Sequence, residues 1–286
     1  MVPEIEKTGF PMADVRYKSE ESSMKKLVAT VAATLVLALT AVGPAAAQET
    51  LKAATDCAYF PFSFRDTDGV LKGYEIDLGD DLARRANFKL EWVCQKFDGL
   101  IPSLLANKFD LIISTMSITD ERRKSIDFSS SYRVSVGQFV GPKGKALNLF
   151  NADGTPNPAA FKDLRVGLAR ATTYDNWMQA KVPDATIVRY DTDAQMYLEL
   201  KAGRVDVLMT NPMKIYLEFL SKPDGAGYDV IGPQIKDEKY FGIGVGVGVR
   251  KGNEALLKRI DAALNDMKKD GTLDKYSKKY FPFAIY

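Results

Sequence analysis

One segment of the chain occurs twice in similar form, and this repeat decides the fold. The first copy reads Leu104-Leu105-Ala106-Asn107-Lys108-Phe109-Asp110-Leu111-Ile112-Ile113-Ser114-Thr115, and the second reads Leu200-Lys201-Ala202-Gly203-Arg204-Val205-Asp206-Val207-Leu208-Met209-Thr210-Asn211. Each copy combines a helix end, a tight turn, an aspartate, an apolar strand and a polar strand end. Ligands of open α/β sheets bind beyond the carboxyl ends of the strands. The repeat therefore predicts two similar units that present Ser114, Thr115, Thr210 and Asn211 to one cleft, although any helix, turn and strand in succession can share this pattern.

The sequence around the repeat alternates short apolar runs with helical periodicity, which indicates βαβ units and a mostly parallel sheet. Helices are expected over 73–87 and 253–271, and a third carries an apolar stripe at Phe97, Leu100, Ile101, Leu104 and Leu105. The run 242–248 has glycine at every second position, unlike the G-x-G-x-x-G that binds dinucleotides. It predicts a strand whose bare face lies close to another backbone or a ligand.

The N-terminal region predicts a targeting segment. Met24-Lys25-Lys26 precedes an uncharged apolar run, and Gly43-Pro44-Ala45-Ala46-Ala47 follows that run. This order is typical of a secretory signal peptide with a small-residue cleavage site, here residues 24–47, and it makes 1–23 an upstream extension. A membrane-spanning helix is the alternative, since about 20 uncharged residues could cross a bilayer, but Gly43 and Pro44 interrupt the run.

Composition excludes several kinds of site. The chain has no histidine and only two cysteines, so common zinc sites, Ser-His-Asp triads and Cys-His dyads are excluded, and we expect no metal and no cofactor. The net charge is +2 and no basic face is clustered in the sequence, so no nucleic-acid partner is expected. In an oxidising compartment Cys57 and Cys94 suggest a disulfide, and two buried free thiols remain the alternative.

Two segments contain residues suited to an anion. Arg122 follows the hydroxyl-rich end of a predicted strand, and its planar fork can donate two parallel hydrogen bonds to a carboxylate, with Thr115 and Ser117 beside it. A solvated helix start is the alternative for Arg122. In the second segment a strand turns into a helix at Thr172 and Thr173, where backbone N–H groups attract negative charge, and ordinary N-capping is the alternative. The aromatic residues Tyr59, Phe62, Phe64 and Phe97 are either core residues or the walls of a stacking slot.

Five motifs occur in order along the chain: Asp56-Cys57-Ala58-Tyr59-Phe60-Pro61-Phe62, Gly73-Tyr74-Glu75-Ile76-Asp77-Leu78, Phe97-Asp98-Gly99-Leu100-Ile101-Pro102-Ser103-Leu104, Ser114-Thr115-Met116-Ser117-Ile118-Thr119-Asp120-Glu121-Arg122 and Lys239-Tyr240-Phe241-Gly242. They closely resemble motifs of bacterial periplasmic amino-acid-binding proteins of ABC importers, and most nearly those of lysine/arginine/ornithine and histidine binders. The resemblance implies two doubly wound α/β lobes of the type II periplasmic-binding-protein fold, joined by two hinge crossings. Lobe 1 would comprise 48–140 and 237–286 and lobe 2 would comprise 141–236, with hinges near 139–143 and 234–240.

The resemblance also implies roles for individual residues. Arg122, Thr115 and Thr173 would hold the α-carboxylate of the ligand. Tyr59 and Phe97 would sandwich its side chain, Asp56 would meet a basic head group, and Ser114, Ser117 and Thr172 would add polar contacts. The cysteine pair of those relatives is missing, because Ala83 and Leu90 stand at its positions.

Asn211 is the main departure from the family pattern, because those relatives usually have an aspartate there that binds the α-ammonium of the ligand. A buried ammonium without its carboxylate costs about 3 to 5 kcal/mol. We therefore hypothesise that the ligand nitrogen is substituted, as in opine-like conjugates of basic amino acids, or that Asp56 or another carboxylate binds the ammonium. Arg170 would suit a second carboxylate, and Asp56 is the only acidic residue expected near the ligand.

The sequence thus predicts a monomeric, non-enzymatic periplasmic receptor. It would capture a polar or basic amino acid, or an amino-acid derivative, by hinge closure and deliver it to an inner-membrane ABC permease. A dehydratase-like periplasmic enzyme of the same fold, acting on a carboxylate substrate, is the alternative and would need a general acid in the cleft. A sensory module is a third possibility, but the chain ends at Tyr286 without a transmembrane or signalling segment.

Overall fold

The computed structural model describes residues 48–282 and Ile285, which belong to one compact unit, 48–286. The expected upstream extension and signal peptide, residues 1–47, lie outside the described residues. Within the described part, no helix is long and apolar enough to cross a membrane.

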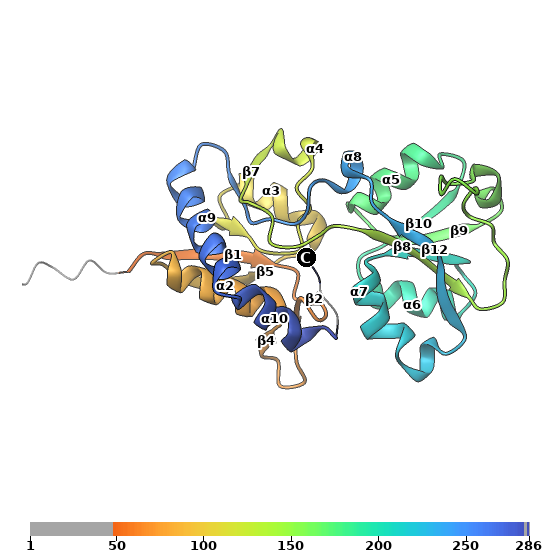
Figure 1. Cartoon of the computed structure of the whole chain (residues 1–286), viewed down its shortest axis with the longest axis horizontal. Coiled ribbons are helices and arrows are strands. Elements are labelled where there is room, and N and C mark those ends of the chain that lie inside the picture. The colour runs from red at the N-terminus through yellow and green to blue at the C-terminus, as the bar shows by residue number, and fades with distance from the viewer. Residues whose placement is uncertain (1–47, 283–284, 286) are drawn as a thin grey trace, which may run out of the picture. The chain divides into compact units, whose positions relative to one another are not determined.

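The first sheet has five strands in the order β5-β1-β6-β13-β7 (Figure 1). Its strands are β1 (Thr50–Thr55), β5 (Lys89–Cys94), β6 (Leu111–Ile112), β7 (Ile126–Phe128) and β13 (Gly248–Arg250). β1 is parallel to β5 and β6, whereas β13 is antiparallel to β6 and β7. A small antiparallel sheet follows β1, with strands β2 (Ala58–Tyr59), β3 (Ser63–Arg65) and β4 (Leu71–Lys72). The helical elements of this part are α2 (Tyr74–Arg85), η1 (Phe97–Gly99), α3 (Leu100–Leu105), α4 (Asp120–Arg123), α9 (Glu254–Lys269) and α10 (Thr272–Tyr280).

The second sheet repeats this plan in the order β10-β9-β11-β8-β12. Its strands are β8 (Gly137–Pro142), β9 (Arg165–Ala169), β10 (Thr186–Tyr190), β11 (Val207–Thr210) and β12 (Tyr228–Ile235). β9 is parallel to β10 and β11, and β8 is antiparallel to β11 and β12. The accompanying helical elements are η2 (Pro158–Phe161), α5 (Thr173–Lys181), α6 (Asp193–Lys201), α7 (Pro212–Ile215), the π-helical turn η3 (Tyr216–Leu220), η4 (Pro223–Gly225) and α8 (Glu238–Phe241). The expected pair of similar α/β units is therefore present.

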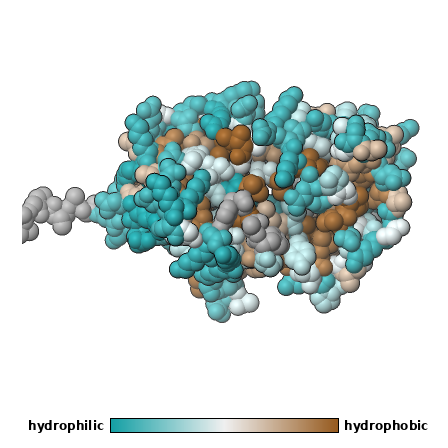
Figure 2. All heavy atoms as spheres, viewed as in Figure 1, coloured by the Kyte–Doolittle hydropathy of each residue, from teal (hydrophilic) through white to brown (hydrophobic). Residues whose placement is uncertain are grey.

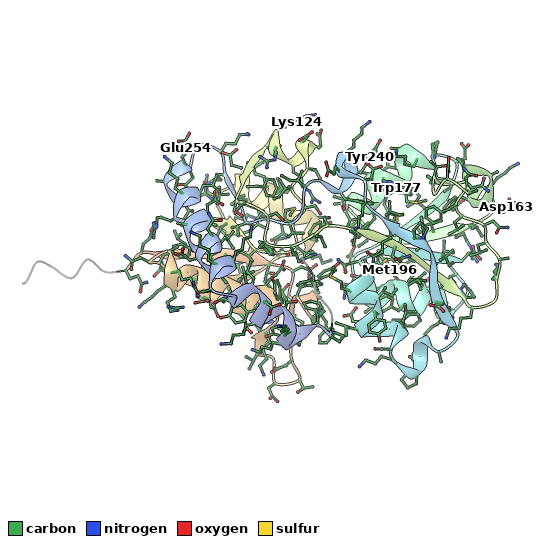
Figure 3. The ribbon with its side chains drawn as sticks, viewed as in Figure 1. Lys124, Asp163, Trp177, Met196, Tyr240 and Glu254 are labelled. Atoms are coloured by element: carbon green, nitrogen blue, oxygen red, sulfur yellow. A yellow bond between two sulfur atoms is a disulfide. The ribbon has the colours of Figure 1, made fainter. Side chains whose placement is uncertain are left out.

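Amphipathic helices cover the sheets as the sequence periodicity predicts. In α2 and α9 the apolar positions 78, 82, 256, 260, 264 and 267 are all buried, and the face of this part seen in Figure 2 is mainly hydrophilic. Around the second sheet, Trp177 of α5 and Met196 of α6 belong to separate buried clusters and lie on opposite sides of the sheet (Figure 3). Each sheet is thus packed on both faces, which leaves its strand ends to build a site.

The run 242–248 differs from its prediction as a strand. Only Gly248 belongs to a strand, β13, because Gly242 and Gly244 have φ values of +71° and +130°, outside the extended region. The expected close approach is confirmed, since a Cβ on Gly242 would lie 1.8 Å from the carbonyl oxygen of Ile118. The expected lobe boundary at 140 falls within β8 and that at 236 directly follows β12; both stay predictions.

Candidate functional site

One pocket collects residues from the strand ends of both sheets. It encloses about 810 Å³, including its opening to solvent. All ten residues that the sequence nominated line it: Asp56, Tyr59, Phe97, Ser114, Thr115, Ser117, Arg122, Thr172, Thr173 and Asn211. Of the other two aromatic candidates, Phe62 is fully buried in the hydrophobic core of the part that contains the first sheet. Neither Phe62 nor Phe64 lines the pocket.

Arg122 stands at one wall of the pocket, on α4. The hydroxyl of Thr119 accepts a hydrogen bond from the Arg122 N–H and caps this short helix. The guanidinium donates to the carbonyl of Ser117 at 3.1 Å and to that of Ala171 at 3.4 Å, and its Cζ lies 5.5 Å from the ring centre of Phe97. Burial lowers the pKa of Arg122 to about 10, so it stays charged at neutral pH. A half-buried, charged fork at this wall is suited to a carboxylate.

The N-terminus of α5 faces the same pocket. Thr172 is its N-cap, because its hydroxyl accepts from the N–H of Asp175 and donates to the carbonyl of Ala169 at 2.7 Å. Thr173 is the first residue of the helix and is buried. Capping and anion binding are therefore compatible here, since the remaining N–H groups of the first turn have no partner within the helix.

Two aromatic residues, Tyr59 and Phe97, and the carboxylate of Asp56 line the pocket. Burial raises the pKa of Asp56, and the nearby carboxylates of Asp193 and Asp98 act in the same direction, while a hydrogen bond from the Ala58 N–H lowers it. A cation placed near Asp56 would offset this desolvation. A pocket lined by two aromatic rings and a carboxylate is thus suited to an aliphatic side chain that ends in a positive charge.

Thr115 faces the pocket but uses its donors elsewhere. Its backbone N–H donates to the Glu75 carboxylate at 2.7 Å, and its hydroxyl donates to the same carboxylate at 3.0 Å. The hydroxyl oxygen can still accept a hydrogen bond, but its proton is committed to Glu75. This geometry favours Thr115 as an acceptor for a ligand N–H, rather than as the carboxylate donor that the resemblance implies.

Asn211 is the N-cap of α7 and is 2% exposed. Its Oδ1 accepts from the N–H groups of Met213 at 2.9 Å and Lys214 at 3.2 Å. An amide oxygen has two lone pairs, and both are used here. The amide therefore offers N–H donors to the pocket. Burial raises the pKa of the nearby Tyr174 hydroxyl, and the Arg133 charge and the Asn211 side chain oppose this shift.

Asp193 also lines the pocket, so the expectation that Asp56 is the only acidic residue there is wrong. Asp193 is the first residue of α6 and is buried, and it accepts from the hydroxyl of Thr210 at 2.9 Å. Thr210, which the repeat placed in the cleft, thus supports a pocket residue and does not line the pocket itself. The carboxyl-end rule that located Asn211 could have located Asp193, because it follows β10 by three residues.

Lys214 is a buried cation beside the pocket that the sequence did not reveal. Its ammonium forms an ion pair with Glu218 and lies 3.8 Å from Asp193. It also donates to the Phe60 carbonyl at 3.4 Å and lies 4.6 Å from the ring centre of Tyr59. The spacing of four residues between Lys214 and Glu218 was the available signal. Lys214 pairs with Glu218 in its own part of the fold and donates to Phe60 in the loop after β2, so it links the two parts of the fold.

Arg170 lines the pocket beside the N-terminus of α5, as the sequence suggested, and it forms an ion pair with Asp191. Its Nε lies 2.7 Å from Asp191, and the ammonium of Lys96 lies 2.8 Å from the other oxygen of that carboxylate. The Arg170 side chain is also 47% exposed. Arg170 and Lys96 thus share the single negative charge of Asp191, and water can solvate the remaining donors of Arg170.

Cys57 and Cys94 form a disulfide with a Cα separation of 5.5 Å. The parallel pairing of β1 with β5 sets Thr55 opposite Cys94, and Cys57 follows two residues later. The bridge therefore holds the loop that carries Asp56 and Tyr59 against the end of β5.

Comparison with known proteins agrees with this geometry. Residues 51–283 match the family described as bacterial extracellular solute-binding proteins, family 3. The L-arginine-binding protein of Pseudomonas aeruginosa is 36% identical over 265 residues, which cover 92% of this chain and 99% of that protein. The lysine/arginine/ornithine-binding periplasmic protein of Escherichia coli K12 is 35% identical, with the same shares covered.

Solved structures show the same fold. A periplasmic binding protein of Salmonella typhimurium with high arginine specificity matches with a TM-score of 0.72 and 30% identity, over 82% of this chain and 99% of that one. A periplasmic His/Glu/Gln/Arg/opine family-binding protein of Silicibacter pomeroyi, solved with lysine, matches with a TM-score of 0.70 and 29% identity, over 82% and 100%. The chain has the two-lobed fold of periplasmic binding proteins and belongs to the bacterial extracellular solute-binding proteins, family 3.

Proposed function

We propose that this protein is the periplasmic receptor of an ABC importer and that its ligand is a basic amino acid with a substituted nitrogen, an opine-like conjugate. The observation that carries this proposal is the state of Asn211, whose amide oxygen is saturated by two backbone N–H groups of α7. A primary ammonium placed there would find N–H donors and no free acceptor on this side chain. A substituted nitrogen has fewer N–H groups to satisfy, and its substituent can fill the space next to the amide.

The rest of the pocket suits the amino-acid part of such a ligand. Arg122, with Ser117 and Thr173, would hold the α-carboxylate. Tyr59 and Phe97 would enclose the aliphatic chain, and Asp56 would pair with the basic head group. The remaining nominated residues, Ser114, Thr115 and Thr172, would supply polar contacts, with Thr115 accepting from the ligand nitrogen.

Closure of the two lobes on the ligand would present the loaded receptor to an inner-membrane permease. Lys96 and Asp191 already join the strand ends of the two sheets at 2.8 Å, and Arg122 reaches the Ala171 carbonyl at 3.4 Å. A ligand that touches both lobes stabilises such a closed state. In this proposal the protein acts as a monomer, is exported through the signal peptide at 24–47, and hinges near 139–143 and 234–240.

Thermal-shift screening tests the proposal, because binding to the native state raises the unfolding midpoint. The panel is free arginine, lysine and ornithine, neutral and acidic amino acids, and N²-(1-carboxyethyl) derivatives of the three basic amino acids. We expect the derivatives to give the largest shifts. Larger shifts with the free basic amino acids would overturn the requirement for a substituted nitrogen. Mass analysis of the recovered ligand should find it unchanged, and a dehydrated product would instead indicate the enzyme.

A further inference from the structure

Arg133 is a buried cation in the pocket wall with unused hydrogen-bond donors. It lies between β7 and β8, lines the pocket and is 2% exposed. Its Nη1 donates to the Val134 carbonyl at 3.0 Å, but Nε and Nη2 are buried and have no hydrogen-bond partner among the described residues. Buried polar groups are nearly always hydrogen-bonded. Two orphaned donors on one guanidinium therefore point to a partner from outside the chain.

The surroundings of Arg133 explain how the fold tolerates its charge without using these donors. Its Cζ lies 4.4 Å from the ring centre of Phe62, a cation–π contact. Burial raises the pKa of the Glu75 carboxyl, and the charge of Arg133 opposes part of this shift. The Glu75 oxygens, however, accept their hydrogen bonds from Thr115 and from Tyr132 at 2.6 Å. Glu75 thus balances the charge of Arg133 and leaves Nε and Nη2 without an acceptor.

Other donors gather at the same end of the pocket. Ser135 lines it, and its hydroxyl lies 2.9 Å from that of Ser117. Asn211 offers only amide N–H groups, because its oxygen caps α7. Tyr174 lies close enough to both Asn211 and Arg133 for each to lower its pKa against the effect of burial. This end of the pocket is therefore rich in hydrogen-bond donors.

We infer that Arg133, with Ser135 and Asn211, forms a second carboxylate-binding subsite, so that the ligand is a dicarboxylate whose second acid group is carried on the substituent of its nitrogen. This inference rests on the proposed function, since Asn211 is the place where the amino nitrogen would lie. The planar fork of Arg133 suits a carboxylate, which accepts two parallel bonds. Arg170 is the less suitable second cation, because its side chain is 47% exposed and pairs with Asp191.

The test compares two ligands that differ only at the second acid group: N²-(1-carboxyethyl)-L-arginine and N²-isopropyl-L-arginine, in which a methyl group replaces the carboxylate. Isothermal titration of the wild-type protein gives the ratio of their dissociation constants, and this ratio needs no variant. We expect the carboxyethyl ligand to bind at least about tenfold more tightly, since charge-assisted hydrogen bonds have about this effect. A ratio near one would overturn the subsite.

Two variants locate the cation. Arg133→Gln is expected to bring the ratio close to one, whereas the matched control Arg170→Gln is expected to keep it. The reverse result would overturn the assignment to Arg133. If Arg133→Gln does not fold, Arg133→Lys keeps the charge but loses the fork, and the ratio should again fall.

The two hypotheses fail in different ways. If both ligands bind more tightly than free arginine but equally to one another, the subsite is wrong and the proposed function stands. If both bind more weakly than free arginine but with the tenfold ratio, the requirement for a substituted nitrogen is wrong and the subsite stands. If neither binds, both are wrong.

Discussion

Replacing Asn211 with aspartate should shift the ligand preference of the pocket toward free amino acids. Aspartate is as good an N-cap as asparagine, so one carboxylate oxygen can accept from the Met213 and Lys214 N–H groups as the amide oxygen does now. The second oxygen then replaces the amide nitrogen and carries charge toward the ligand amine. The fold should tolerate the change, because these two N–H groups also stabilise the new charge.

The magnitude follows from what the ligand ammonium lacks at present. A buried ammonium without a carboxylate costs about 3 to 5 kcal/mol, which corresponds to more than about a hundredfold in affinity. Asp193 already provides a carboxylate in the pocket, but it lies 3.8 Å from Lys214 and accepts from Thr210, so it offsets only part of this cost. We therefore expect Asn211→Asp to tighten free L-arginine binding by at least about tenfold.

Isothermal titration with L-arginine measures the change, and circular dichroism on heating shows whether the fold is retained. Asn253→Asp is a matched control, because Asn253 precedes α9 as its N-cap and makes no side-chain capping bond, and it does not line the pocket. This control should leave arginine affinity within about threefold of wild type, as screened charges outside the pocket contribute little. Unchanged or weaker arginine binding by a folded Asn211→Asp protein would refute the reasoning and would assign the ammonium to Asp193 or Asp56.

Three further changes probe the rest of the site. Arg122→Ala should weaken binding of the preferred ligand by at least about tenfold, because it removes charge-assisted bonds to the α-carboxylate. Isothermal titration measures this loss in a variant whose unfolding midpoint matches that of the wild type. Undiminished affinity would show that Arg122 does not hold the α-carboxylate. Affinity for a cationic ligand should fall as the pH drops toward the raised pKa of Asp56, since the protonated carboxyl cannot pair with a cation. This fall should begin above pH 3.8, the ordinary pKa of an aspartate. An equally steep fall in the Asp56→Asn variant would show that Asp56 does not cause it. Reduction of the Cys57–Cys94 bridge, which spans 37 residues, should lower the free energy of unfolding by about 4 kcal/mol and the melting temperature by roughly 10 °C. Calorimetry of the reduced protein measures this loss and should match that of a variant with both Cys57→Ser and Cys94→Ser.

The sequence predicted the two similar α/β units and several pocket residues because both depend on local patterns, but the expected mostly parallel sheet is wrong, since β13 and β8 pair antiparallel with both of their neighbours. Apolar runs followed by polar strand ends mark the carboxyl edge of a parallel sheet, and this rule brought Ser114 and Asn211 to one pocket. Helical periodicity gave the buried faces of α2 and α9 for the same reason. The family motifs added Asp56 and singled out Tyr59 and Phe97 from the four aromatic residues that the local sequence had left as either core or pocket wall.

Residues that are positioned by long-range pairing could not be predicted from local patterns. Arg133 reaches the pocket from the loop after β7 through a bridge to Val245, a partner more than 100 residues away in the sequence. The disulfide depends on the register of β1 against β5, which two cysteines in a sequence do not specify. The glycines of 242–248 suggested a strand by their alternation, but the positive φ values that close packing against Ile118 requires belong to the folded chain.

Asn211 and Arg133 together determine which ligand groups can bind at this end of the pocket, because a neutral amide stands there in place of a carboxylate. With aspartate at 211, the end would present an acceptor to an ammonium, and the guanidinium of Arg133 would compete for the same charge. With asparagine, the side-chain oxygen is used by α7, and the same pocket is lined by Arg133, whose Nε and Nη2 have no hydrogen-bond partner among the described residues. A ligand that places oxygen atoms there satisfies these donors, whereas a ligand that places an ammonium there leaves them without a partner and adds a second cation beside Arg133. The substitution therefore reverses the polarity that the ligand must have at this end.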